Sequence, residues 1–264
     1  MIPTIEAASV SLSIGRKRLL GGVSLAVAPG ERVALVGTNG AGKSTLLRTL
    51  SGELAASSGQ IRLRGRDLHG YRPRELSLHR AVLSQALTVA FPFTVSEIVR
   101  MGAGERRDST VDKLVDDALA QVDLQDFQDR NINTLSGGEQ QRVHFARVLV
   151  QASCGELVHG PGLILLDEPT ASLDLRHQLD LIAAVKHRAS SGTTVIAILH
   201  DLNIATLFAN RIVILHQGVI AADGPPHKTI TDELLRKTFG VSNSVCRIPD
   251  GDMPYVLPHH ACKD

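Results

Sequence analysis

Excess charge of either sign is missing from this sequence. It has 28 Lys and Arg against 27 Asp and Glu, which gives a formal net charge of +1 over 264 residues. Such a balance creates no long-range field that would draw the protein onto nucleic acid or an anionic membrane surface. We therefore expect no nucleic-acid partner unless a specific motif argues for one.

Long apolar runs and paired cysteines are missing as well. The longest apolar runs, such as residues 194–199, fall far short of the roughly 18 to 20 residues that cross a bilayer. The start of the chain has no basic stretch followed by an apolar core, so a cytosolic protein is expected. Cys154, Cys246 and Cys262 have no CxxC spacing, so we expect neither a disulfide nor a structural zinc site.

The order of the apolar patterns predicts an α/β fold. Short apolar strands at 32–36, 163–166 and 194–199 are separated by helical patterns, including one over 175–189. Strands separated by helices indicate a mainly parallel sheet that is covered by helices.

A helical insert of roughly fifty residues is expected in the middle of the chain. Residues 94–97 have the form of a capping box, and apolar residues recur at helical spacing over 111–122. Further along, residues 217–218 predict a hairpin turn and 231–239 predict a short helix. The proline-containing tail after Val241 is expected to be irregular.

A glycine-rich loop stands between a predicted strand and a predicted helix, and it fits the pattern G-x-x-x-x-G-K-[ST]. The glycines let successive backbone N–H groups point at phosphates. Lys43 supplies positive charge at the β and γ phosphates, and the Ser44 hydroxyl binds Mg²⁺. The predicted nucleotide-binding residues are Gly37, Thr38, Asn39, Gly40, Ala41, Gly42, Lys43, Ser44 and Thr45.

Two carboxylates, Asp167 and Glu168, follow the apolar strand at 163–166. Ligands of parallel sheets bind at the carboxyl ends of the strands. Asp167 can hold Mg²⁺ directly or through water, and Glu168 can orient and deprotonate an attacking water. Taken alone, the run is equally compatible with a buried strand and a solvated acidic turn, but the phosphate loop favours the functional interpretation.

A second phosphate-directed feature is the run Ser136, Gly137, Gly138 and Glu139, which opens a predicted helix. It places a hydroxyl and backbone N–H groups at a helix N-terminus, where anions bind. By itself the run is also simply a well-capped helix start. Two incomplete phosphate sites in one chain suggest that a nucleotide is held between two copies of the protein, which predicts a homodimer.

Taken together and in this order, the motifs resemble those of ABC-transporter ATPase subunits. The resemblance spans residues 4–240 and implies the ABC ATPase fold. That fold is a P-loop α/β core with a mainly parallel sheet, an N-terminal antiparallel β subdomain and a helical insert. The motifs are Gly37–Thr45, Gln85, Leu135–Gln140, Leu163–Glu168, Ser172–Asp174 and His200. The implied single domain, 1–264, has a catalytic core at about 1–85 and 155–240, a helical subdomain at about 86–150 and a tail at about 241–264.

The same resemblance implies roles for individual residues. Gln85 would contact Mg²⁺ and sense the transmembrane partner, and His200 would contact the γ-phosphate. Asp174 would lie at the dimer seam, and residues 136–139 would contact the γ-phosphate of ATP on the opposite subunit. Ile14 stands where the family commonly stacks an aromatic residue on adenine, so apolar packing is expected there. Taken alone, Gln85 would be a surface amide and His200 a structural histidine.

Three stretches are similar to the haem branch of the iron-chelate and cobalamin importer ATPases, at residues 90–102, 151–161 and 218–226. The second stretch is interpreted as an enlarged connection between the helix that begins at 136–139 and the strand that precedes Asp167, and it favours haem. The other two stretches are shared with siderophore and cobalamin importers. The resemblance therefore implies an ATPase that energises haem import, with a siderophore or cobalamin importer as the alternative.

The resemblance also implies cofactors, partners and a location. ATP and Mg²⁺ are expected, together with two copies of a transmembrane permease and a periplasmic haem-binding protein that acts through them. The protein would lie peripherally on the cytoplasmic face of the bacterial inner membrane. Phe91 and Phe93 flank Pro92 and are candidates for an apolar ledge that a permease helix contacts, but they could equally pack the insert onto the core.

Two alternatives come from other classes. Soluble ABC-type ATPases of DNA repair carry long coiled-coil insertions, and those of translation usually carry two ATPase modules in one chain; this sequence shows neither. A P-loop kinase or GTPase is disfavoured by the run at 136–139 and by His200.

Overall fold

The computed structural model describes residues 2–85, 91–242, 245–247, 254–256 and 262–263. Its contacts divide the chain into two compact units. Unit 1 comprises Met1–Gly70 with Ile196–Asp264, and unit 2 comprises Tyr71–Val195. These units are defined by packing, so the functional core and helical subdomain limits stay a prediction.

Unit 1 begins with a four-stranded antiparallel sheet in the order β2-β1-β4-β5. β1 pairs with β2 from Ile5 opposite Val27 to Ile14 opposite Lys17. Alternate side chains of β1 are buried, with an irregularity near Ser9, which has a φ of 50°. The expected N-terminal antiparallel sheet is therefore present. Its strands are β1 (Ile5–Ile14), β2 (Lys17–Val27), β4 (Ser58–Leu63) and β5 (Arg66–Asp67).

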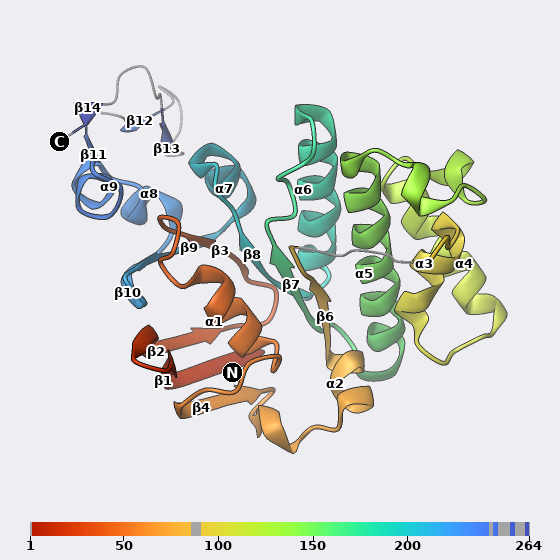
Figure 1. Ribbon diagram of the computed structural model, residues 1–264, viewed down its shortest axis with the longest axis horizontal. Coiled ribbons are helices and arrows are strands. Elements are labelled where there is room, and N and C mark those ends of the chain that lie inside the picture. Colours follow the sequence, from red (N-terminus) through yellow and green to blue (C-terminus); the bar gives the residue numbers. More distant parts are fainter. Residues whose placement is uncertain (1, 86–90, 243–244, 248–253, 257–261, 264) are drawn as a thin grey trace. The chain divides into compact units, whose positions relative to one another are not determined.

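The rest of unit 1 holds the strand that leads into the glycine-rich loop. β3 pairs in parallel with β9, and β10 folds back antiparallel on β9. The predicted hairpin turn is confirmed, since Gln217 and Gly218 both have positive φ angles, of 49° and 78°. Figure 1 shows α1 beside the antiparallel sheet of the same unit. The elements are β3 (Arg32–Val36), α1 (Lys43–Leu50), the 3₁₀ turn η1 (Leu68–Gly70), α7 (Leu202–Phe208), β9 (Arg211–His216), β10 (Val219–Gly224), α8 (Pro226–Thr229) and α9 (Asp232–Phe239).

The tail after Val241 is not wholly irregular, so that expectation was wrong for the described part. β12 (Val245–Arg247) pairs antiparallel with β13 (Pro254–Val256), and β11 (Val241–Ser242) pairs with β14 (Cys262–Lys263). A proline is compatible with a strand when it is the first residue, as Pro254 is in β13.

Unit 2 is organised around one long helix, α5. α2, α3 and α4 all pack on it, and Figure 1 shows α3 and α4 beside it. The predicted capping box is confirmed, because the Thr94 N–H donates to Glu97 Oε2 at 2.8 Å and the Glu97 N–H donates to Thr94 Oγ1 at 3.2 Å. β6 and β7 pair in parallel. The elements are α2 (Pro73–His79), β6 (Arg80–Leu83), α3 (Val95–Arg100), η2 (Met101–Ala103), α4 (Ser109–Gln121), η3 (Gln125–Phe127), η4 (Ile132–Thr134), α5 (Gly137–His159), β7 (Leu163–Asp167) and α6 (Leu175–Ser190). β8 (Thr194–Ile198) begins in unit 2 and ends in unit 1.

The stretch at 151–161, expected to be an enlarged connection, is mostly helix, because α5 continues to His159. Gly155 stands inside this extension although glycine is a poor helix former. Its missing side chain is what the packing needs, since a Cβ there would collide with the carbonyl oxygen of Leu78 in α2. The extended helix is thus stabilised by tertiary contact with α2 rather than by a local signal.

Within the described residues, none of the helices has both the length and the apolar character required to pass through a bilayer.

Candidate functional site

The glycine-rich loop joins β3 to α1 in a backbone conformation that requires glycine. Gly37, Gly40 and Gly42 have φ angles of 150°, 78° and 101°. Added side chains would also be obstructed, because a Cβ at Gly37 would collide with the Leu215 carbonyl oxygen and one at Gly42 would lie 2.9 Å from the Leu19 carbonyl oxygen. The loop is therefore shaped by its neighbours in unit 1 as well as by its own sequence.

Lys43, the first residue of α1, is buried with 6% of its surface exposed. Its Nζ donates to the carbonyl oxygens of Gly37 at 2.8 Å and Thr38 at 3.0 Å. The ammonium group is thus held against the loop backbone at a helix N-terminus, where phosphate oxygens bind. Ser44 and Thr45 follow in the first turn and are half-buried.

Ile14 and His200, the other predicted site residues of unit 1, stand at the ends of strands. Ile14 closes β1 and is 63% exposed, so it offers an apolar surface. His200 is exposed and follows Leu199, whose N–H donates to the Leu35 carbonyl oxygen at 3.3 Å. That bond ties the end of β8 to β3, the strand that leads into the glycine-rich loop.

The two predicted carboxylates belong to unit 2 and have different environments. Asp167 is the last residue of β7 and is only 4% exposed. Glu168 is half-buried and has a φ of 52°, a conformation that non-glycine residues rarely adopt. Gln85 Nε2 donates to Glu168 Oε2 at 2.7 Å. The structure therefore brings Gln85 and Glu168 into direct contact, a pairing that the sequence does not predict.

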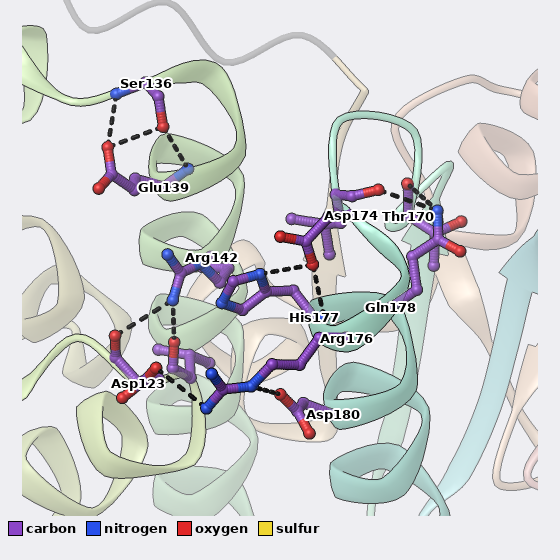
Figure 2. A network of polar contacts seen from close by, with 12 residues as sticks. Asp123, Ser136, Glu139, Arg142, Thr170, Asp174, Arg176, His177, Gln178 and Asp180 are labelled. Carbon is purple, nitrogen blue, oxygen red and sulfur yellow. Dashed lines mark hydrogen bonds and ion pairs between the residues drawn. The ribbon is translucent and has the colours of Figure 1, made fainter.

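Ser136 is the N-cap of α5 and forms a capping box with Glu139 (Figure 2). The Ser136 N–H and hydroxyl each donate to Glu139 Oε2 at 2.7 Å, and the Glu139 N–H donates to Ser136 Oγ at 3.4 Å. Hydrogen bonds from the Ser136 side chain, and then from its backbone, lower the pKa of the Glu139 carboxyl group. The predicted capped helix start is present, and its acidic member is kept ionised.

Asp174 is the N-cap of α6 and accepts two hydrogen bonds from His177 (Figure 2). The His177 N–H lies 2.9 Å and its Nδ1 lies 2.8 Å from Asp174 Oδ1. The backbone bond is the main cause of a lowered pKa for the Asp174 carboxyl group. The same loop meets the start of α5, since a Cβ at Gly138 would lie 2.7 Å from the Ser172 carbonyl oxygen.

Two glutamines that the sequence analysis did not single out contact the backbone after β7. Gln141 Nε2 donates to the carbonyl oxygens of Glu168 at 3.5 Å and Pro169 at 3.4 Å. Gln178 Nε2 donates to those of Thr170 at 3.3 Å and Leu173 at 3.0 Å. They lie on different helices, so no local sequence pattern could have indicated a shared role.

The site residues therefore form two sets, one in each unit. Unit 1 holds the glycine-rich loop, Ile14 and His200, and unit 2 holds Gln85, the two carboxylates, the start of α5 and Asp174. The first set has the charge and backbone geometry that bind phosphates. Ser44 in unit 1, and Gln85 and Asp167 in unit 2, offer hydroxyl, amide and carboxylate oxygens, each of which is a hard ligand of the kind that Mg²⁺ prefers.

Residues 20–171 match the family model described as ABC transporter. A protein named hemin import ATP-binding protein HmuV, from Rhodopseudomonas palustris strain BisA53, is 56% identical over 260 residues, covering 98% of this chain and 96% of its own length. A protein of the same name from Bradyrhizobium diazoefficiens is 58% identical over 258 residues, with 98% and 96% covered.

Two solved structures show the same fold. The inward-facing conformation of a putative metal-chelate type ABC transporter aligns with a TM-score of 0.78 at 23% identity, covering 100% of this chain and 98% of that one. The dimeric structure of a bacterial ABC transporter cassette aligns with a TM-score of 0.73 at 26% identity, covering 84% and 98%.

Proposed function

This chain belongs to the ABC transporter family as an ATPase coupled to transport, and we propose that it energises the import of haem. ATP use is supported by the glycine-rich loop with its buried Lys43. Haem as the cargo is supported by one observation, the likeness over almost the whole chain to proteins that are named for hemin import.

ATP would bind with its phosphates on the backbone N–H groups of 37–45. Lys43 would exchange the carbonyl oxygens of Gly37 and Thr38 for phosphate oxygens, which bind an ammonium group more strongly because they carry charge. Ile14 would pack its exposed side chain on the adenine, and His200 would contact the γ-phosphate.

Ser44, Gln85 and Asp167 would hold Mg²⁺, which neutralises charge on the phosphates when it is bound. Glu168 would act on the attacking water. The water oxygen would form a bond to the γ-phosphorus while the bond between that phosphorus and the β–γ bridging oxygen breaks, and the Glu168 carboxylate would take the water's proton. The hydrogen bond from Gln85 would help to orient this carboxylate.

A second copy of the chain would complete each ATP site. Residues 136–139 of one copy would contact the γ-phosphate of ATP on the other, and Asp174 would lie at the seam between them. The capping box and the bonds from His177 support this role by presenting both segments in fixed conformations.

Two permease copies and a periplasmic haem-binding protein would complete the importer, with this chain on the cytoplasmic face of the inner membrane. Phe91 is 66% exposed, whereas Phe93 is half-buried and its carbonyl oxygen accepts from the Ile132 N–H at 3.0 Å. We therefore assign permease contact to Phe91 and packing of the insert to Phe93. The Phe91 and Phe93 rings form a T-shaped contact, with centroids 6.2 Å apart.

The test is haem uptake into vesicles that contain the permease, with this chain and Mg-ATP on the side corresponding to the cytoplasm. The unmodified chain should drive uptake, whereas Glu168→Gln should bind ATP, accumulate as an ATP-bound dimer and lose both hydrolysis and uptake. Loss of the base should lower the rate by at least about 10²-fold.

Each part of the proposal has its own contrary result. Wild-type hydrolysis by Glu168→Gln would remove the base assignment. Uptake of a ferric siderophore or cobalamin in place of haem would contradict the assignment of haem as the cargo but not the assignment of the chain as an ATPase.

A further inference from the structure

The backbone after β7 is strained at Glu168. Its φ of 52° places a residue with a Cβ in the left-handed region, which is unfavourable and persists only where the surroundings impose it. The Ala171 N–H donates to the Glu168 carbonyl oxygen at 3.3 Å, so the chain turns tightly just after this residue. The direction in which the Glu168 carboxylate points depends on how this turn is held.

Gln141 holds the first part of the turn from α5. Its side-chain amide is half-buried and donates to two successive carbonyl oxygens, those of Glu168 and Pro169, at 3.5 and 3.4 Å. One amide shared between two adjacent carbonyls restrains the peptide planes on either side of the Pro169 Cα, and the first of these planes is also the one that follows the strained residue Glu168.

Gln178 holds the second part of the turn from α6 (Figure 2). Its half-buried amide donates to the carbonyl oxygens of Thr170 and Leu173 at 3.3 and 3.0 Å. Gly138 provides a third contact with this turn, because its missing side chain lets the start of α5 lie against the Ser172 carbonyl oxygen. The segment 168–173 is thus bonded to two helices through two glutamine amides and packed against the start of one of them.

We infer that Gln141 and Gln178 are positioning residues for ATP hydrolysis, which hold the backbone of 168–173 so that the Glu168 carboxylate stays aimed at the attacking water. The inference rests on the proposed role of Glu168. Neither amide is proposed to contact ATP or the attacking water. Both act through the backbone, and a displacement of the base by about 1 Å can lower a rate by up to about 10²-fold.

The test replaces each amide by a side chain of similar length that cannot donate a hydrogen bond, in Gln141→Met and Gln178→Met of the full chain. The kcat for ATP hydrolysis should fall about ten- to hundredfold, with the KM for ATP unchanged. The Ala171 and Leu173 amides, which donate within this segment at 3.3 and 3.2 Å, should exchange their hydrogens faster.

A matched control comes from the same helix. Gln151 of α5 also donates through Nε2 to two backbone carbonyl oxygens, those of Ser77 at 3.1 Å and Arg80 at 3.2 Å. Gln151→Met should lower the Tm as much as Gln141→Met does but retain kcat. Equal kcat values in the Gln141→Met and Gln151→Met variants would overturn the inference.

A double-mutant cycle separates positioning from a general structural role. In the Glu168→Gln background, Gln141→Met should lower the single-turnover rate no further, because the group that it positions is already absent. An additive loss would contradict the inference. If Glu168→Gln instead hydrolysed ATP at the wild-type rate, the proposed role of Glu168 as the base would be wrong. Amide exchange in Gln141→Met and Gln151→Met would still show whether Gln141 restrains the segment 168–173.

Discussion

His144 on α5 is a buried titratable side chain. It is 6% exposed, and among the described residues neither ring nitrogen has a hydrogen-bond partner. Burial, aided by the positive charge of Arg147, lowers the pKa of His144 to about 4. The imidazole therefore stays neutral in the folded protein at pH values where an unfolded chain would protonate it.

We predict that His144 makes the folded state less stable as the pH falls from 6.5 toward 4. In this window the unfolded chain, with an ordinary histidine pKa near 6.5, binds a proton that the folded chain does not. The free energy of unfolding should fall by up to about 1.4 kcal/mol per pH unit from this residue, and by no more than about 3 kcal/mol in all.

Denaturant unfolding between pH 7 and pH 4 measures the effect. His144→Leu, which cannot bind a proton, should show a shallower decline than the unmodified chain, because the other histidines contribute equally to both. Parallel curves would mean that His144 protonates alike in the folded and unfolded states.

At the scale of elements, α5 connects the parts of unit 2. It begins at the capping box of Ser136, contacts the turn after β7 through Gln141, and donates from Arg147 Nη2 to the Val82 carbonyl oxygen of β6 at 3.3 Å. At its far end, Gly155 lies against α2. A change in the packing of this helix is therefore expected to affect several elements at once.

We predict that Gly155→Ala is destabilising although alanine favours helix. The new Cβ would collide with the backbone of Leu78, and overpacking of this kind costs about 1–3 kcal/mol. Gly137→Ala in the first turn of the same helix is the control, because a Cβ there meets nothing within 4 Å. Chemical unfolding of the nucleotide-free chain should show a loss for Gly155→Ala only, and equal free energies of unfolding would rule out the proposed contact.

At the scale of the whole molecule, the charges are nearly balanced, with a formal net charge of +1. Docking to a permease is therefore expected to depend more on shape and apolar contact than on long-range attraction. ATP binding is expected to depend on charge, because the charge of ATP is concentrated on its phosphates. A ligand that binds only the folded chain stabilises the folded state by mass action.

We predict that Mg-ATP at about 100 times its Kd stabilises the chain by about 2.7 kcal/mol, which should raise the Tm by about 5–10 °C. Lys43→Ala should abolish this rise, since it removes the positive charge that the loop holds in place. The comparison is between melts with and without nucleotide for each variant, because the loss of two hydrogen bonds also lowers the baseline. A full ATP-induced rise in Lys43→Ala would show that the nucleotide binds elsewhere.

Local features were predictable from the sequence. The strand Arg32–Val36, the turn at 217–218 and the Thr94 capping box depend on residues adjacent in the sequence, so their backbone conformations follow from short patterns of apolar spacing, caps and glycines. The glycine-rich loop was predictable from its own motif, although Leu19 and Leu215 also limit its conformation. The helix at 73–79 was not predicted, although Pro73 stands at its first position.

Contacts between residues distant in the sequence were decided only by the tertiary structure. The bond from Gln85 to Glu168, the bonds from Gln141 and Gln178 to the turn after β7, and the continuation of α5 past Gly155 all depend on packing of separate elements. The sequence by itself determined which chemical groups the candidate site offers. The tertiary structure decided which groups orient one another, because a hydrogen bond between distant residues leaves no local pattern in either of them.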